Sequence, residues 1–292
     1  FIKIARTVSW RGTIPSLNYI LSSTIWHQEH NGFSHQNPGF IDDVLQRQSE
    51  FTNVYFPADV NSALVVFDRM MRSSQEINVM VCGKKPLPVW RTLDEAKVDI
   101  EQGISVWNFA SDDDPHIVLA SAGDYPTQEV LAAISLIRLE IPAFRIRYVN
   151  INSLSSVDFG IGNAHHHVSR DNFFEYFTSD RPVRISFHGY PQTIKQILFD
   201  YGCDAVRFKV HGYEESGSIT TPFDMMVRNH IDRFHLAIEA FSLAEDQGII
   251  NAERAKELRE KYENKLIEHK AYIIEFGNDP EEITNWIWQS RS

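Results

Sequence analysis

Short apolar segments alternate along the chain with longer segments in which apolar residues recur at helical spacing. Buried strands are short and apolar, whereas helices that pack on a sheet repeat their apolar residues every three or four positions, so this alternation predicts an α/β fold. The predicted strands are residues 54–56, 77–81, 116–120, 144–151, 183–187 and 205–210. The predicted helices are residues 40–48, 63–71, 93–107, 128–140, 194–201, 222–244 and 251–276.

The first strand–helix–strand unit has clear boundaries. Asp59 and Asn61 follow the strand at residues 54–56 and stand where helix N-caps belong, ahead of the apolar run 63–71. A largely apolar strand at residues 77–81 comes next. The segment is therefore predicted to form a βαβ unit with a right-handed crossover.

Pro86-Leu87-Pro88 interrupts this pattern, and we expect a domain boundary there, between residues 1–88 and residues 89–292. The second part opens with the same alternation of helices and strands. It ends in a long amphipathic helix at residues 251–276, whose apolar face is formed by Ala255, Leu258, Tyr262, Leu266 and Ile273.

Length, composition and net charge narrow the class of protein. With 292 residues, of which 43% are hydrophobic, the chain can build a sizeable core. Its net charge of −11 argues against a nucleic-acid partner but not against small anions bound in a basic cleft. No apolar run approaches the roughly 20 residues of a membrane span. The two cysteines, Cys82 and Cys203, are interpreted as free thiols of a cytoplasmic protein.

The most unusual stretch of the chain is the polar loop at residues 28–40. It reads Gln-Glu-His-Asn-Gly-Phe-Ser-His-Gln-Asn-Pro-Gly-Phe, with His30 and His35 among several carboxamides. Gly32, Pro38 and Gly39 exclude a regular element. From composition alone, a substrate-binding loop and an ordinary hydrogen-bonded loop are equally good interpretations.

This loop closely resembles the signature of the thiamine-diphosphate-dependent phosphoketolases. The resemblance continues through residues 54–61, 81–86, 220–224 and 285–288, so it covers nearly the whole chain. It implies the end of a transketolase-like pyrimidine-binding domain followed by the C-terminal α/β domain. The diphosphate-binding domain, with the metal ligands, would then lie upstream of this chain.

The resemblance also implies an activity, that of an aldehyde-lyase using thiamine diphosphate and Mg²⁺. The family cleaves xylulose 5-phosphate, fructose 6-phosphate or both with inorganic phosphate. The products are acetyl phosphate and glyceraldehyde 3-phosphate or erythrose 4-phosphate. A homodimer or higher homo-oligomer is expected, with the chain alone inactive because the upstream thiamine-binding region is missing.

The site residues come from the same resemblance. His30 and Asn31 would hold the phosphate of the substrate, and His35 would face the reacting carbons beside the cofactor and handle a proton, so that His30 and His35 are the catalytic candidates. Lys84 would complete the phosphate site. Without the resemblance, a solvated lysine at a domain junction would be the better interpretation of Lys84, and we keep that interpretation for Lys85.

Other motifs carry less weight. A metal site at residues 165–167 is disfavoured because three consecutive histidines diverge in a strand or helix. Asp158-Phe159-Gly160 and Gly160-Ile161-Gly162 lack the companions of a kinase or a dinucleotide-binding motif. The turn at residues 123–127 opens a helix and could bind an anion, although plain capping is favoured.

Two alternatives to a phosphoketolase remain. One is a non-catalytic binding or regulatory module whose C-terminal domain binds a nucleotide or another subunit. Two features support this alternative: the upstream domains are missing, and the turn at residues 123–127 opens a helix. The other is a transketolase, which the form of the loop from His30 to His35 makes less favourable.

Overall fold

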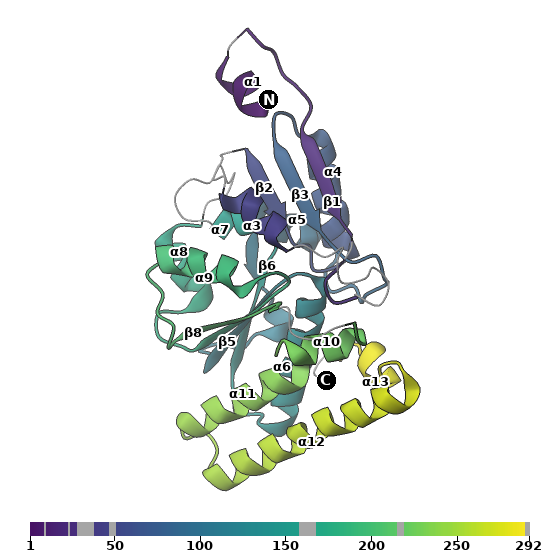
Figure 1. Ribbon diagram of the computed structural model, residues 1–292. Helices are drawn as coiled ribbons and strands as arrows, with labels where there is room; N and C mark the ends of the chain where they lie inside the picture. Colours follow the sequence, from purple (N-terminus) through teal and green to yellow (C-terminus); the bar gives the residue numbers. More distant parts are fainter. Residues whose placement is uncertain are drawn as a thin grey trace.

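The computed structural model describes residues 1–8, 10–22, 24–27, 38–46, 51–157, 168–214 and 219–289 (Figure 1). It contains a three-stranded and a five-stranded sheet. The three-stranded sheet has the order β1-β3-β2, and all its strands are parallel. The strands of this sheet and the helices of the same part of the chain are α1 (Ile2–Thr7), β1 (Leu17–Leu21), α3 (Gly39–Gln46), β2 (Thr52–Tyr55), α4 (Val60–Arg72) and β3 (Ile77–Val81).

The βαβ prediction is confirmed, because α4 connects the neighbouring parallel strands β2 and β3. Asp59 caps α4 by accepting a hydrogen bond from the backbone N–H of Ser62 at 2.8 Å. Asn61 is not a cap. It lies inside the first turn of α4, and its side chain donates instead to the carbonyl of Arg91 at 2.7 Å.

The five-stranded sheet has the order β4-β6-β5-β7-β8, with β4 antiparallel to β6 and the other neighbours parallel. Every residue of β5 and β7 is buried, as expected for parallel strands covered on both faces. The strands are β4 (Ile104–Val106), β5 (Ile117–Ala122), β6 (Ile146–Ile151), β7 (Val183–Phe187) and β8 (Phe208–His211).

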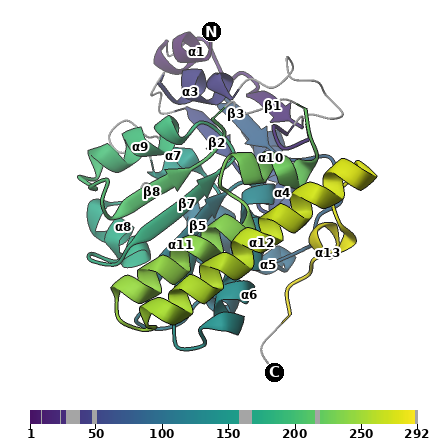
Figure 2. The same ribbon diagram turned by 60° about the horizontal axis from the view of Figure 1, so that its bottom comes forward.

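Helices cover both faces of this sheet, and the two views show α11 and α12 lying side by side over α6 (Figures 1 and 2). Side chains of β5 alternate between the faces: Ile117 and Leu119 pack with α6, α11 and α12, whereas Val118 and Ala120 pack with α8 and α9. The helices are α5 (Leu93–Gln102), α6 (Asp124–Glu140), α7 (Leu154–Val157), α8 (Arg170–Phe177), α9 (Pro191–Asp200), α10 (Pro222–Arg228), α11 (Arg233–Asp246), α12 (Ala252–Phe276) and α13 (Glu281–Thr284), with a 3₁₀ turn at Asn108–Ala110.

The two sheets share one apolar core. Val54 and Val79 of the first sheet belong to the same buried cluster as Val118 and Val149 of the second. The backbone N–H of Phe56 also donates to the carbonyl of Asn152 at 2.7 Å. The boundary expected near residue 88 stays a prediction, but the first sheet is packed onto the second rather than tethered to it.

Two predicted helices differ most from the structure. The helix expected at residues 93–107 ends at Gln102, because Gly103 adopts a left-handed conformation (φ 75°) and the chain then forms the edge strand β4. The helix expected at residues 222–244 is split into α10 and α11, since His230 has a positive φ of 56° and Asp232 caps a new helix. The α/β class and the long terminal helix α12 are confirmed.

Candidate active site and adjoining cavity

The loop with the candidate residues His30, Asn31 and His35 lies outside the described residues, but the chain on either side of it is described. On the upstream side, Trp26 is fully buried. Its ring contacts His188 at 6.2 Å and Tyr213 at 6.1 Å between centroids, and these residues follow β7 and β8. The described chain ahead of the loop is therefore anchored at the carboxyl edge of the second sheet.

The downstream flank is held at the same edge. Helix α3 begins at Gly39, and its Asp42 accepts a hydrogen bond from the hydroxyl of Thr193 in the first turn of α9. On the other side, the ring of Phe40 meets Tyr19 of β1 edge to face at 5.6 Å. Both flanks of the candidate loop are thus fixed where the two sheets meet.

Lys84 is exposed and lies three residues beyond the end of β3. The turn that carries it is held by Gly83, whose backbone N–H donates to Asp124 Oδ2 at 2.5 Å. A Cβ on Gly83 would lie 3.0 Å from that oxygen and 3.0 Å from the ring of Tyr125. Glycine therefore permits the close approach of this turn to the start of α6.

Asp124 occupies the N-terminus of α6 with its own carboxylate. Besides Gly83, it accepts a hydrogen bond from the N–H of Tyr125 at 2.8 Å. Burial raises the pKa of Asp124, although these hydrogen bonds and the nearby His27 act in the opposite direction. The N-cap Gly123 has no side chain to cap α6, but the N–H of Tyr125 in the first turn is already engaged by the Asp124 carboxylate, which leaves it unavailable to an anion.

Neither Cys82 nor Cys203 takes part in a disulfide, as predicted. Burial, with a smaller effect of Asp124, raises the pKa of the Cys82 thiol to about 11. Because the thiolate is the nucleophilic form, Cys82 is not suited to covalent catalysis at neutral pH.

His188 is a residue that the sequence did not single out. It directly follows β7, and burial lowers its pKa to about 3, so its imidazole is neutral. Its Nδ1 has no hydrogen-bond partner among the described residues. Gly123 (φ 113°) packs so closely on it that an added Cβ would lie 2.9 Å from the Cβ of His188. A polar residue immediately after a buried strand is the sequence signal that could have identified it.

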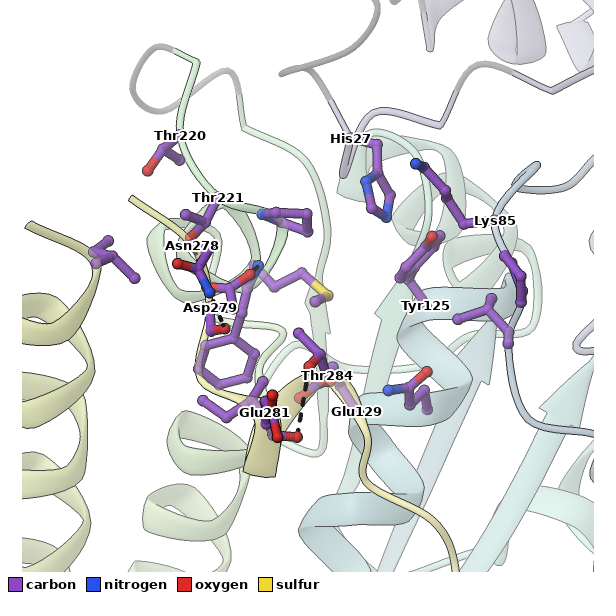
Figure 3. A pocket seen from close by; sticks show the side chains of 18 of the residues that line it. His27, Lys85, Tyr125, Glu129, Thr220, Thr221, Asn278, Asp279, Glu281 and Thr284 are labelled. Carbon is purple, nitrogen blue, oxygen red and sulfur yellow. Dashed lines mark hydrogen bonds between the residues drawn. The ribbon is translucent and has the colours of Figure 1, made fainter. Parts of the chain in front are cut away.

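A cavity of about 920 Å³ opens beside this region (Figure 3). His27, Lys85 and Tyr125 stand on one side, and Thr221, Asn278 and Asp279 on the other. Lys85 is exposed, as predicted, but it also lines this cavity. The ring of His27 packs on that of Tyr125 at 4.8 Å between centroids.

In the described part of the chain, no three His, Cys, Asp or Glu side chains are grouped to hold a metal ion. The motifs at residues 158–167, including the three histidines, lie outside that part. None of the described helices is both long enough and apolar enough to span a membrane.

Known proteins resemble the chain over almost its whole length. Residues 84–288 match the family model described as the XFP C-terminal domain, and residues 1–73 match the one described as D-xylulose 5-phosphate/D-fructose 6-phosphate phosphoketolase. A probable phosphoketolase of Bradyrhizobium diazoefficiens is 40% identical over 295 residues, and one of Brucella abortus is 42% identical over 294. These alignments cover 100% and 99% of the chain but only 36% of each relative, so the chain spans about a third of their length.

Solved structures agree on the fold. A transketolase variant from Pichia stipitis matches 81% of the chain and 32% of its own with a TM-score of 0.58 at 13% identity. A split-gene transketolase, described as an inactive β4 tetramer, matches 83% of the chain and 74% of its own with a TM-score of 0.54 at 15% identity. The predicted transketolase-like fold is therefore confirmed, and the chain, matched by family models over residues 1–73 and 84–288, belongs to the phosphoketolase family.

Proposed function

We propose that the chain is the C-terminal portion of a phosphoketolase that cleaves xylulose 5-phosphate, fructose 6-phosphate or both. Inorganic phosphate would be the second substrate, and acetyl phosphate would form together with glyceraldehyde 3-phosphate or erythrose 4-phosphate. The observation that carries this proposal is membership of the family across both matched segments. In the resulting aldehyde-lyase, the remaining two thirds of the relatives' length would supply the rest of the active site.

Thiamine diphosphate, when bound, supplies the electron sink for carbon–carbon cleavage. The N–H groups at the start of α6 and at Gly83 do not fit its diphosphate, because Asp124 already accepts from both and is itself a carboxylate. We therefore assign the diphosphate and Mg²⁺ to the thiamine-binding region upstream. This chain would contribute His35, which moves a proton at the reacting carbons and touches the cofactor.

His30, Asn31 and Lys84 would bind phosphate, first that of the sugar and then the inorganic one. For Lys84, the support is its exposure and the rigid turn on which it stands. A lysine held on a fixed backbone at the carboxyl edge of a parallel sheet can meet a phosphate with little loss of conformational freedom. For His30 and Asn31, the support is the matching motif and the two anchored flanks of the loop.

We further propose that the chain alone does not turn over substrate and that the complete enzyme is a homodimer or a higher homo-oligomer in the cytoplasm. The split-gene transketolase supports the first point, since a tetramer of chains of similar extent is described there as inactive. The free cysteines support the location, because thiols persist in a reducing compartment.

The test compares turnover of the full-length protein and two variants, with acetyl phosphate as the product measured. His35→Ala should lower kcat about 100-fold or more, the usual effect of losing a general acid–base group. Lys84→Ala should raise the KM for inorganic phosphate by about tenfold or more, which corresponds to one charge-assisted hydrogen bond.

Lys256→Ala, which removes an exposed lysine near the start of α12, is the matched control and should change neither constant. Unchanged turnover in His35→Ala would remove that residue from the mechanism. Acetyl phosphate formed by the 292-residue chain alone would contradict the proposed need for the upstream region.

A further inference from the structure

A buried side chain whose oxygen lacks a partner belongs to the wall of the cavity. Gln128, in the first turns of α6, is 7% exposed and lines this cavity. Its Oε1 has no hydrogen-bond partner among the described residues. Because such an atom costs free energy when it is buried unpaired, a ligand in the cavity toward which this amide turned would supply the missing hydrogen bond.

The rest of the wall is mainly apolar. Pro88, Phe223, Met226 and Ile283 come from separate segments of the chain and meet around the same space. The volume of about 920 Å³ lies in the range of sites for small organic molecules. Sugar phosphates carry polar groups over their whole length, so they do not match walls of this kind.

Two acidic residues of the wall are already engaged within the protein. Glu129 receives hydrogen bonds from Arg233 Nε at 2.9 Å and Arg233 Nη2 at 2.7 Å. Asp279 accepts from Thr221 Oγ1 at 2.6 Å, from the N–H of Phe223 at 2.9 Å, and lies 2.9 Å from His269 Nε2. Both carboxylates are therefore already engaged in hydrogen bonds within the protein.

The positive charge of the wall, in contrast, is open to a ligand. Lys85 is exposed at the cavity and forms no ion pair within the described part of the chain. His27 stands beside it in Figure 3, whereas Glu281, an exposed carboxylate, lies on the opposite wall. An anionic group would therefore be bound at the Lys85 end of the cavity.

We propose that this cavity binds a small organic anion with an apolar, ring-like body and a hydrogen-bond donor. The anion would meet Lys85, the body would contact the apolar wall, and the donor would meet the Gln128 amide, turned so that Oε1 points to the ligand. This site is separate from the phosphoketolase reaction, and its occupation can be measured without turnover.

The probe for the test is 1-anilinonaphthalene-8-sulfonate, which has a sulfonate, two aromatic ring systems and one N–H group. N-phenyl-1-naphthylamine, the same molecule without the sulfonate, is the matched neutral probe. Fluorescence titration of the full-length protein should show one saturable site that binds the sulfonate more tightly than the neutral compound.

Three variants locate that site. Lys85→Met should weaken binding of the sulfonate about tenfold and leave the neutral probe unaffected, because one charge-assisted contact is lost. Gln128→Leu should weaken both probes, since both carry the N–H group. Lys195→Met is the control, because it makes the same change of charge at an exposed position of α9 that does not line the cavity.

Thermal unfolding of each variant shows whether it folds, and the exposed Lys85 can be replaced without disturbing the core. If Lys85→Met and Gln128→Leu bind the sulfonate as tightly as the Lys195→Met control, the probe binds elsewhere and the proposal is wrong. Displacement of the probe by millimolar fructose 6-phosphate would also overturn it, because the cavity would then belong to the substrate site. Loss of catalytic activity in His35→Ala leaves this test untouched.

Discussion

Helices α4 and α6 each follow a parallel strand, yet their surroundings differ. In α6, 13 of the 17 residues are buried, because the second sheet covers one side and α11 the other. In α4, Ser62, Val66 and Met70 are buried, while a second apolar row is open to solvent. This outer row consists of Val60, Leu64, Phe67 and Met71, which are 43% to 62% exposed.

The comparison separates two kinds of apolar pattern that look alike in sequence. The apolar residues of α6 form a core that closes within this chain, together with α11 and α12. The outer row of α4 remains uncovered here, and an exposed apolar side chain adds little to the free energy of folding. We therefore expect the core around α6 to carry most of the stability of the chain.

The largest difference is expected from the same substitution in the two regions. Phe241→Ala in α11 removes a fully buried ring from the core and should lower the free energy of unfolding by about 3–5 kcal/mol. Phe67→Ala on the outer row of α4 removes a ring that is 43% exposed and should cost less than about 1 kcal/mol. Urea unfolding of both variants measures the difference. Equal losses would show that α4 is as well covered in solution as α6.

A smaller effect on the free energy of unfolding is expected where polar contacts hold the segment between β2 and α4 to residues 90–91, just before α5. The buried Asp59 accepts hydrogen bonds from Ser62 N at 2.8 Å, Trp90 N at 2.8 Å and Arg91 N at 2.9 Å. Asp59→Ala leaves these three N–H groups without the carboxylate and should cost about 2 kcal/mol.

Thr92→Ala is the comparison, because Thr92 caps α5 at an exposed position, where its hydroxyl accepts from Glu95 N at 3.3 Å and donates to Glu95 Oε2 at 2.8 Å. It should cost about 1 kcal/mol or less in the same urea experiment. Asp59→Asn keeps an acceptor oxygen and should fall between the two. A loss in Asp59→Ala no larger than that in Thr92→Ala would mean that Asp59 acts only as a helix cap.

Much of this fold follows from local sequence. The strands at residues 77–81 and 183–187 have the predicted bounds, because each is a largely apolar run of strand length. Helix α12 at residues 252–276 also agrees, since its apolar period persists and Asn251 and Gly277 mark its ends. The three-residue strand β4 was missed because nothing in residues 104–106 distinguishes it from a continuing helix, apart from Gly103 before it.

The site was less predictable, for a physical reason. Lys84 and the residues of the loop were found through a family motif, and their roles remain a proposal. Trp26 and His188 carry no motif, because their burial arises only when two segments far apart in the chain meet at a sheet edge. Similarly, the cavity beside Lys85 is formed by segments that extend in the sequence from His27 to Thr284.

The smallest predicted difference concerns acid stability, and it again contrasts α11 with α4. Glu239 of α11 lies 3.0 Å from His211 Nε2 and accepts from Arg184 Nε at 2.6 Å. Burial would raise its pKa, but the close approach and charge of His211 and the charge of Arg184 outweigh burial and lower the pKa from 4.5 to about 2. On α4, Asp68 pairs with Arg72 at 2.8 Å, and both side chains are largely exposed.

A carboxyl group whose pKa is lower in the folded state stabilises the protein above its unfolded pKa, and this contribution is lost as the pH falls towards the folded value. The stabilising contribution of ionised Glu239 should therefore be lost as the pH falls from 4.5 to 2. About 1 kcal/mol of the free energy of unfolding should already be lost at pH 4 relative to pH 7. Urea unfolding from pH 7 to pH 3 should show a shallower decline for Glu239→Gln than for the unchanged protein. Asp68→Asn should leave the decline as it is, because salt and water screen an exposed pair. If instead Asp68→Asn makes stability less dependent on pH and Glu239→Gln does not, acid stability depends on the exposed surface of α4 rather than on the buried ion pairs of α11, which packs on α6.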